Sequence, residues 1–174
     1  APLQRTRALV QAFEAVQPLP EGGGALSPAQ RAANAKAFAA LDGFFDYEEL
    51  LGSPLRPHEA AFAPADLERF RKDFRELVRL TAYPSSGEFF REARYEILPG
   101  PPQGGDATVR LLARVEKEDL DLEVGFVWRS SAAGLRLVDL AFDGASLLAD
   151  YRNQFGRIVA KEGAAGLKRR LDER

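Results

Sequence analysis

Two side chains in the C-terminal third, Asp139 and Ser146, have the chemistry of a hydrolytic site. A serine nucleophile needs a base, and the sequence contains a single histidine, His58, in a distant proline-flanked segment. Gly144–Ser146 supplies half of a nucleophile-elbow motif, but Leu148 stands where the second glycine belongs. The sequence therefore lacks the pattern that Ser-His-Asp catalysis requires, and we predict no serine-hydrolase site.

The same residues have structural roles at a predicted helix start. Ser146 precedes a segment with helical apolar spacing, where a serine side chain accepts a hydrogen bond from a backbone N–H of the first turn. Asp139 falls on a predicted strand with apolar neighbours. Its carboxylate is expected either to pair with Arg152 or to accept backbone donors.

Composition excludes several other kinds of site. The 174-residue chain has no cysteine, which rules out disulfides, thiol catalysis and thiolate metal sites, and one histidine cannot form a multi-histidine site. Lys plus Arg is 24 and Asp plus Glu is 26, a balance that argues against a general nucleic-acid binder. We therefore expect no cofactor, no metal site and no nucleic-acid partner.

Hydropathy argues for a soluble domain. No apolar run approaches the roughly 20 residues that cross a bilayer. The basic stretch Lys168–Arg170 could steer the protein toward anionic groups, but a solvated face explains it as well.

Apolar residues in the first half recur at helical spacing. This pattern predicts a helix over residues 2–17 that stops before Pro18, and a short helix near 46–51. Between them, Ser27–Gln30 has the order of a capping box with proline at the first helical position, and starts a helix to about Leu41.

The clearest helical pattern begins at Pro64, with an apolar face, charged residues elsewhere and acids in its first turn. Pro84 is expected to end this helix, because proline removes a hydrogen-bond donor. A last long helix is predicted from about Ser146, with Gly163 as its stop and a short basic segment after it.

Between these helices the apolar period changes to two. Alternation predicts strands near 93–97, 109–115, 120–128 and 135–142, separated by turn-forming residues. This is the pattern of an antiparallel meander with one buried face.

Together these elements predict an α+β fold with a helical N-terminal half, a four-stranded antiparallel curved sheet covered on one face by helices, and a C-terminal helix. We expect one domain over residues 1–174. Residues 1–24, an N-terminal helix and a glycine-rich linker, are too short to form a separate core.

The C-terminal third also carries a recognisable motif set. Its residues, in chain order, are Leu137–Leu140, Phe142–Leu147 and Asp150–Phe155. With Phe45–Leu50 and Phe70–Tyr83 upstream, the order and spacing over roughly residues 30–172 resemble the MlaC / toluene-tolerance family.

That resemblance implies a periplasmic phospholipid carrier, an auxiliary component of an ABC transport system. It implies a protein that is not an enzyme and has no catalytic residues. Its partners would be phospholipid, an inner-membrane ABC transporter complex and an outer-membrane lipid-transport complex. A shuttle of this kind would be a monomer, and it would hold acyl chains in an apolar cavity between the sheet and the helices.

An acyl chain of about 16 carbons would cost on the order of 10 kcal/mol to leave in water, so a carrier must enclose it. The candidate wall combines the inward face of the meander with apolar faces of the central and last helices. Its residues are Phe74, Leu77, Val78, Val109, Leu111, Leu122, Val124, Phe126, Leu147, Tyr151 and Phe155. A dry, filled core would use the same residues, and periodicity cannot separate the two.

Two other hypotheses stay open at this stage. The first is a small-molecule-binding protein or enzyme of nuclear-transport-factor-like fold, in which Asp139, or Tyr83 with Tyr95, would act in an apolar pocket. The second is an adaptor with a filled core that works through a surface patch.

Overall fold

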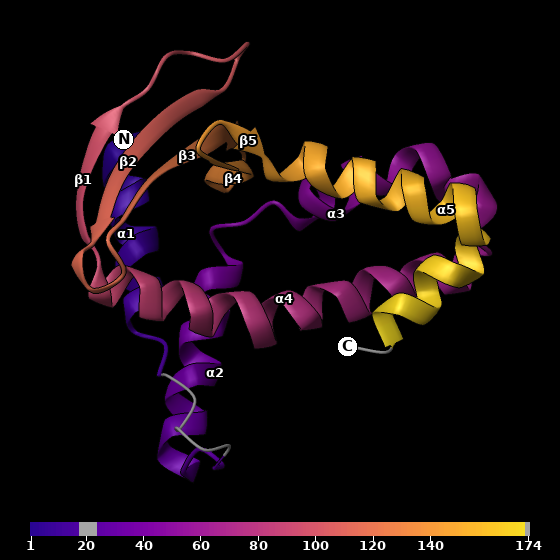
Figure 1. The fold of residues 1–174 in the computed structure, drawn as a ribbon, viewed down its shortest axis with the longest axis horizontal. Coiled ribbons are helices and arrows are strands. Elements are labelled where there is room, and N and C mark those ends of the chain that lie inside the picture. Colours follow the sequence, from indigo (N-terminus) through magenta and orange to yellow (C-terminus); the bar gives the residue numbers. More distant parts are fainter. Residues whose placement is uncertain (18–23, 173–174) are drawn as a thin grey trace.

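The sheet lies at one end of the molecule, and two long helices extend from it (Figure 1). The structure, a computed structural model, describes residues 1–17 and 24–172, without the side chains of some helical residues, Val78 and Lys168 among them. Most of the predicted glycine-rich linker lies outside these ranges. The helices are α1 (Pro2–Glu14), α2 (Pro28–Asp42), α3 (Tyr47–Leu55), η1 (Arg56–Ala61), α4 (Pro64–Glu92), η2 (Glu116–Glu118) and α5 (Leu147–Asp172).

The sheet is antiparallel, in the order β1-β2-β3-β4-β5. Its strands are β1 (Arg94–Pro99), β2 (Ala107–Val115), β3 (Leu120–Ser131), β4 (Gly134–Phe142) and β5 (Ala145–Ser146). The four-strand prediction was wrong by one strand. The fifth has only two residues, too few for an alternating pattern, and a tight turn through Asp143 and Gly144, both at positive φ, folds it back onto β4.

Helix α1 covers much of the inner face of the sheet. Val109 pairs with Phe126 and Leu111 with Val124, and the four side chains pack against α1. A register shift between Val127 and Trp128 is accompanied by full burial of the indole, whose Nε1 donates to Thr6 Oγ at 2.9 Å. We call this cluster the sheet core. Its buried members include Leu9, Val10, Phe13, Tyr83, Phe90, Val109, Leu111, Val124, Phe126, Trp128 and Leu137.

The predicted start of α2 is confirmed in detail. Ser27 Oγ accepts from Gln30 N at 3.2 Å, and the Gln30 side chain accepts from Ser27 N at 2.9 Å. These two bonds satisfy donors that would otherwise be orphaned at a helix start.

The predicted end of α4 at Pro84 was wrong, because the helix continues to Glu92. An interior proline destabilises a helix by about 3 kcal/mol. The segment beyond it gains tertiary contacts instead: Phe90 is buried in the sheet core, and Gly87 packs so closely on α1 that an added Cβ would lie 2.4 Å from Phe13 O. Packing therefore outweighs the local preference.

Gly163 interrupts α5 rather than ending it. Its φ of 72° is non-helical, as expected from its predicted role as a stop, and the chain resumes a helix that reaches Asp172.

A second apolar cluster lies away from the sheet, among α3, α4 and α5. We call it the helical core. Its buried members are Leu55, Phe70, Phe74 and Phe155, with Tyr47, Phe62, Leu67, Tyr151, Ile158 and Val159 packed against them. Helices α4 and α5 both run from the sheet core to the helical core (Figure 1). No helix within the described residues is long and apolar enough to cross a membrane.

Candidate functional site

Most predicted wall residues of the sheet lie in its filled part. Val109, Leu111, Val124 and Phe126 are at most 3% exposed and pack in the sheet core. Among the predicted wall residues of the sheet, only Leu122, near the start of β3, is half-buried.

Part of the inner face of the sheet is accessible where β3 begins and β4 ends. Side chains alternate along a strand, so Leu120 and Leu122 share the face of Val124. Phe142 pairs directly with Val124 and therefore also lies on that face. Leu120 is 40% and Phe142 43% exposed, which leaves apolar surface accessible beside the start of α5. We call Leu120, Leu122 and Phe142 the open end.

The predicted residues of the helices build an aromatic wall in the helical core. The centroid of the Phe74 ring lies 5.2 Å from that of Tyr151, with an interplanar angle of 84°. It lies 5.9 Å from the centroid of Phe155, with an angle of 79°. Phe70 meets Phe155 at 5.8 Å and 83°. Edge-to-face contacts of this kind fix ring positions, and Phe70, Phe74 and Phe155 are at most 8% exposed.

Between the two cores, two leucines of α4 are incompletely buried. Phe74 and Tyr83 belong to different cores and are nine residues apart, about 14 Å along a helix. In this interval Leu77 is half-buried and Leu80 is 58% exposed. Leu147 is half-buried at the corresponding start of α5, and the predicted wall residue Val78 has no described side chain.

A polar network bridges the two cores at this interval. Tyr47 packs against both cores, and its hydroxyl hydrogen-bonds that of Tyr83. Tyr83 Oη donates in turn to Asp42 Oδ1 at 2.8 Å, so Tyr47 is the donor in the bond between the phenols. Burial raises the pKa of Tyr47 to about 12 and raises that of Tyr83 further. Both phenols are therefore neutral hydrogen-bonding groups at ordinary pH.

Two arginines of α4 lie against this network. Asp42 Oδ2 is 3.3 Å from Arg79 Nε and 3.6 Å from a terminal nitrogen of Arg75. The Arg75 guanidinium also lies over the Tyr47 ring, 4.7 Å from its centroid. Sequence analysis missed this cluster, because its members come from α2, α3 and α4 and share no local motif.

The residues considered for hydrolysis form a helix cap instead. Asp139 accepts from Ser146 Oγ at 2.5 Å and from the backbone N–H groups of Leu140 and Leu148, and Ser146 Oγ accepts from Ala149 N. The prediction of backbone donors for Asp139 is confirmed. Arg152 reaches a different partner, the hydroxyl of Ser53 at 3.0 Å.

His58 is far from this cap. Its ring atoms lie 3.7 and 3.9 Å from the position that a Cβ on Gly156 would take. Gly156 is ten residues beyond Ser146, about 15 Å along α5. A serine and histidine so separated cannot exchange a proton directly.

Tyr83 and Tyr95, considered together for an enzyme of nuclear-transport-factor-like fold, do not share a hydrogen-bond network. Tyr95 donates to Glu14 at 2.9 Å, outside the network that holds Tyr83. Among the residues that the structure describes, no group of three or more carboxylates and histidines is placed to hold a metal ion.

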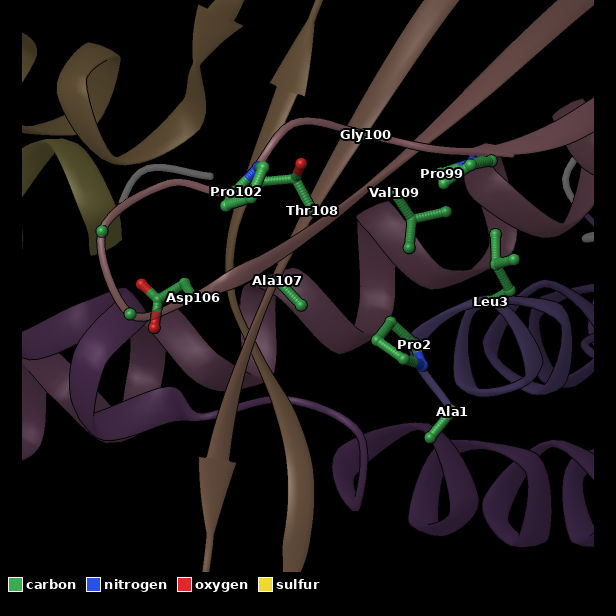
Figure 2. A pocket seen from close by; sticks show the side chains of 12 residues that line it. Ala1, Pro2, Leu3, Pro99, Gly100, Pro102, Asp106, Ala107, Thr108 and Val109 are labelled. Atoms are coloured by element: carbon green, nitrogen blue, oxygen red, sulfur yellow. The ribbon is translucent and has the colours of Figure 1, made fainter.

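A hollow of about 460 Å³ opens at the other end of the sheet, between the start of α1 and the β1–β2 loop (Figure 2). Leu3, Ala107 and Val109 contribute apolar wall, and they also contact the sheet core. Its one carboxylate, Asp106, is held by Arg129 through two 3.0 Å hydrogen bonds. Of the predicted wall residues, only Val109 lines this hollow.

The fold and the site define a small α+β protein in which an accessible apolar sheet end and an aromatic helical wall flank an interval with incompletely buried leucines. The chain belongs to the MlaC protein family, whose model matches residues 16–173. No curated protein sequence matches the chain.

A solved structure shares the fold. It is a phospholipid-binding protein from Ralstonia solanacearum, determined at 1.53 Å in complex with a phospholipid. The two chains are 17% identical, with a TM-score of 0.67, over 98% of this chain and 92% of that one.

Proposed function

We propose that this protein binds phospholipid and carries it through the periplasm, with acyl chains held between the open end of the sheet and the aromatic wall of the helical core. Family membership and the phospholipid-bound structural neighbour support binding. The observation that carries the location is the accessible apolar surface of Leu120 and Phe142 on an otherwise covered sheet face.

The geometry of the interval fits this role. A carrier must offer acyl chains an interior nearly as apolar as a membrane. Phe142 and Leu122 would form one side, and Phe74, Tyr151 and Phe155 the other. Leu77, Leu80 and Leu147, which lie between the two cores, would also contact the acyl chains.

Binding explains the structure better than catalysis does. The carboxylate and hydroxyl of the cap are committed to holding α5, and the buried tyrosines are committed to one another and to Asp42. The resemblance to this family implies a carrier that exchanges lipid with an outer-membrane lipid-transport complex and an inner-membrane ABC transporter. We propose the same partners here, with the protein acting as a monomer.

Native mass spectrometry of the purified protein, followed by organic extraction and lipid analysis, tests this function. We expect a diacyl phospholipid at near one-to-one stoichiometry. Protein that is free of lipid and also takes none from phospholipid vesicles would contradict the proposal.

A matched pair of variants tests the location. Phe142→Glu places a charge on the open end, whereas Leu112→Glu places one on the opposite face of the same sheet, where Leu112 is 37% exposed. We expect Phe142→Glu to lose lipid and Leu112→Glu to retain it, because a carboxylate beside acyl chains must be desolvated. Equal lipid content in both variants would rule out the open end.

A further inference from the structure

The stripe Arg71, Arg75 and Arg79 runs along α4 next to the aromatic wall. The three residues are spaced by four, so they lie one turn apart on one side of the helix. Phe70 and Phe74, each one position earlier, belong to the helical core. Cationic groups therefore border the apolar surface where the acyl chains are proposed to lie.

The outer two arginines are held by carboxylates. A terminal nitrogen of Arg71 lies 2.6 Å from Glu59 Oε1. Arg79 lies 3.3 Å from Asp42 and 3.6 Å from Glu76. These pairs place positive and negative charges together and leave little attraction for a further anion.

Arg75 is held differently. Its nearest carboxylate among the described residues, that of Asp42, is 3.6 Å away, beyond hydrogen-bond distance. Asp42 already accepts from Tyr83 Oη and pairs with Arg79, so one carboxylate is shared between two guanidinium groups. The Arg75 side chain is 48% exposed, which leaves N–H donors available to a ligand from solvent.

The Tyr47 ring orients Arg75. The guanidinium carbon lies 4.7 Å from the ring centroid, and a cation–π contact of this kind does not consume the N–H donors of the guanidinium. Tyr47 itself is fixed by its bond to Tyr83 and by packing against both cores. The guanidinium thus lies on a rigid support where apolar interior meets water, the boundary that a phospholipid phosphate must occupy when its acyl chains are enclosed.

We infer that Arg75 binds the phosphate of the phospholipid through charge-assisted hydrogen bonds, and so makes this site selective for phosphate-bearing lipids over neutral lipids with the same acyl chains. The inference rests on the proposed function. It assigns the headgroup to the junction of α2, α3 and α4, next to Tyr47.

The test compares uptake of phosphatidylglycerol and diacylglycerol with identical acyl chains, measured by native mass spectrometry and by titration. A charge-assisted hydrogen bond corresponds to a change of about ten-fold or more in affinity. We expect Arg75→Gln to weaken phosphatidylglycerol binding by at least that factor and to leave diacylglycerol binding unchanged. Arg75→Lys, which retains the charge but loses the planar fork, should give an intermediate affinity.

Arg110→Gln is the matched control. Arg110 is an exposed arginine on the outer face of the sheet, 2.6 Å from Glu123, and its loss should alter neither lipid. Thermal melting and circular dichroism show whether each variant is folded, and Arg75→Lys supplies the comparison if Arg75→Gln is not.

The other outcomes are distinguishable. Wild-type protein that takes neither lipid overturns the proposed function itself. Wild-type protein that takes both, with Arg75→Gln or Arg75→Lys unchanged or weakened equally for both lipids, overturns only the role of Arg75. Inorganic phosphate that binds lipid-free protein as tightly as phosphatidylglycerol does, and only when Arg75 is present, would assign the site to free phosphate and overturn the headgroup assignment.

Discussion

Asp139 has the side chain of a candidate catalytic residue, but in the structure its carboxylate anchors the start of α5 to β4. It accepts from the Ser146 hydroxyl and from two backbone N–H groups, so it joins β4 to the first turn of α5. That junction positions Tyr151 and Phe155, which form part of the aromatic wall. The residue therefore affects the site through the helix that it caps.

Removing this anchor should destabilise the fold. We expect Asp139→Ala to lower the free energy of unfolding by about 2–3 kcal/mol, and Ser146→Ala by about 1 kcal/mol, because helix donors lose their acceptors. Urea unfolding measures both changes. Ser130→Ala, at an exposed position near the end of β3, should stay within about 0.5 kcal/mol of wild type. A loss for Asp139→Ala no larger than that control would remove the anchor role.

Tyr47 and Tyr83 should link stability to alkaline pH. Burial raises their pKa values above 10 in the folded state, so their contribution is full below pH 10 and is lost as pH rises through the folded values. Tyrosinate absorbance should show these two phenols ionising only as the protein unfolds.

Two tyrosine variants distinguish ionisation of the buried phenols from ionisation of exposed ones. Tyr47→Phe should reduce the number of tyrosinates released in the cooperative step, whereas Tyr95→Phe, at a position 36% exposed, should reduce only the gradual phase. Ionisation of all four tyrosines before any loss of folded structure would contradict the buried network.

At the scale of elements, α4 is the structural link between the sheet and the helical core. Its far half reaches the sheet core only because it passes through Pro84 and packs on α1 at Gly87. Arg91 strengthens this contact by donating to Glu14 O at 3.0 Å and to Val16 O at the end of α1.

Two glycine substitutions test that packing. Gly87→Ala should destabilise the protein by about 1–3 kcal/mol, because the new methyl group would lie 2.4 Å from Phe13 O and force the helices apart. Gly52→Ala in α3 has no atom within 4 Å of its new Cβ and should stabilise by about 0.5–1 kcal/mol. Thermal or urea unfolding gives both values. Similar effects of the two substitutions would show that α1 and α4 are not in tight contact.

At the scale of the molecule, long helices join two separate cores, and the proposed lipid would lie in the interval between them. A ligand that binds only the folded state stabilises it by about 2.7 kcal/mol at 100 times its dissociation constant. For a domain of this size we expect removal of lipid to lower the melting temperature by roughly 5–10 °C. Calorimetry of extracted and reloaded protein measures the change. A melting temperature that is independent of lipid would argue for a filled, ligand-free core.

The sequence by itself determined the element types and much of their order. Helical spacing and capping residues located α2, and alternation located β1 to β4, because these patterns record which side of each element is buried. The motif set in the C-terminal third identified the family. Local rules failed at Pro84, where packing on α1 decided the outcome, and at β5, which is too short to leave a pattern.

Only the tertiary structure decided which apolar residues fill a core and which remain accessible. Val124 and Leu122 lie on the same face of β3 and have similar side chains, yet Val124 is buried in the sheet core and Leu122 is half-buried in the open end. Likewise, Asp42, Tyr47 and Arg75 meet only because three helices converge. Periodicity specifies a face of an element, whereas burial depends on how much of that face another element covers.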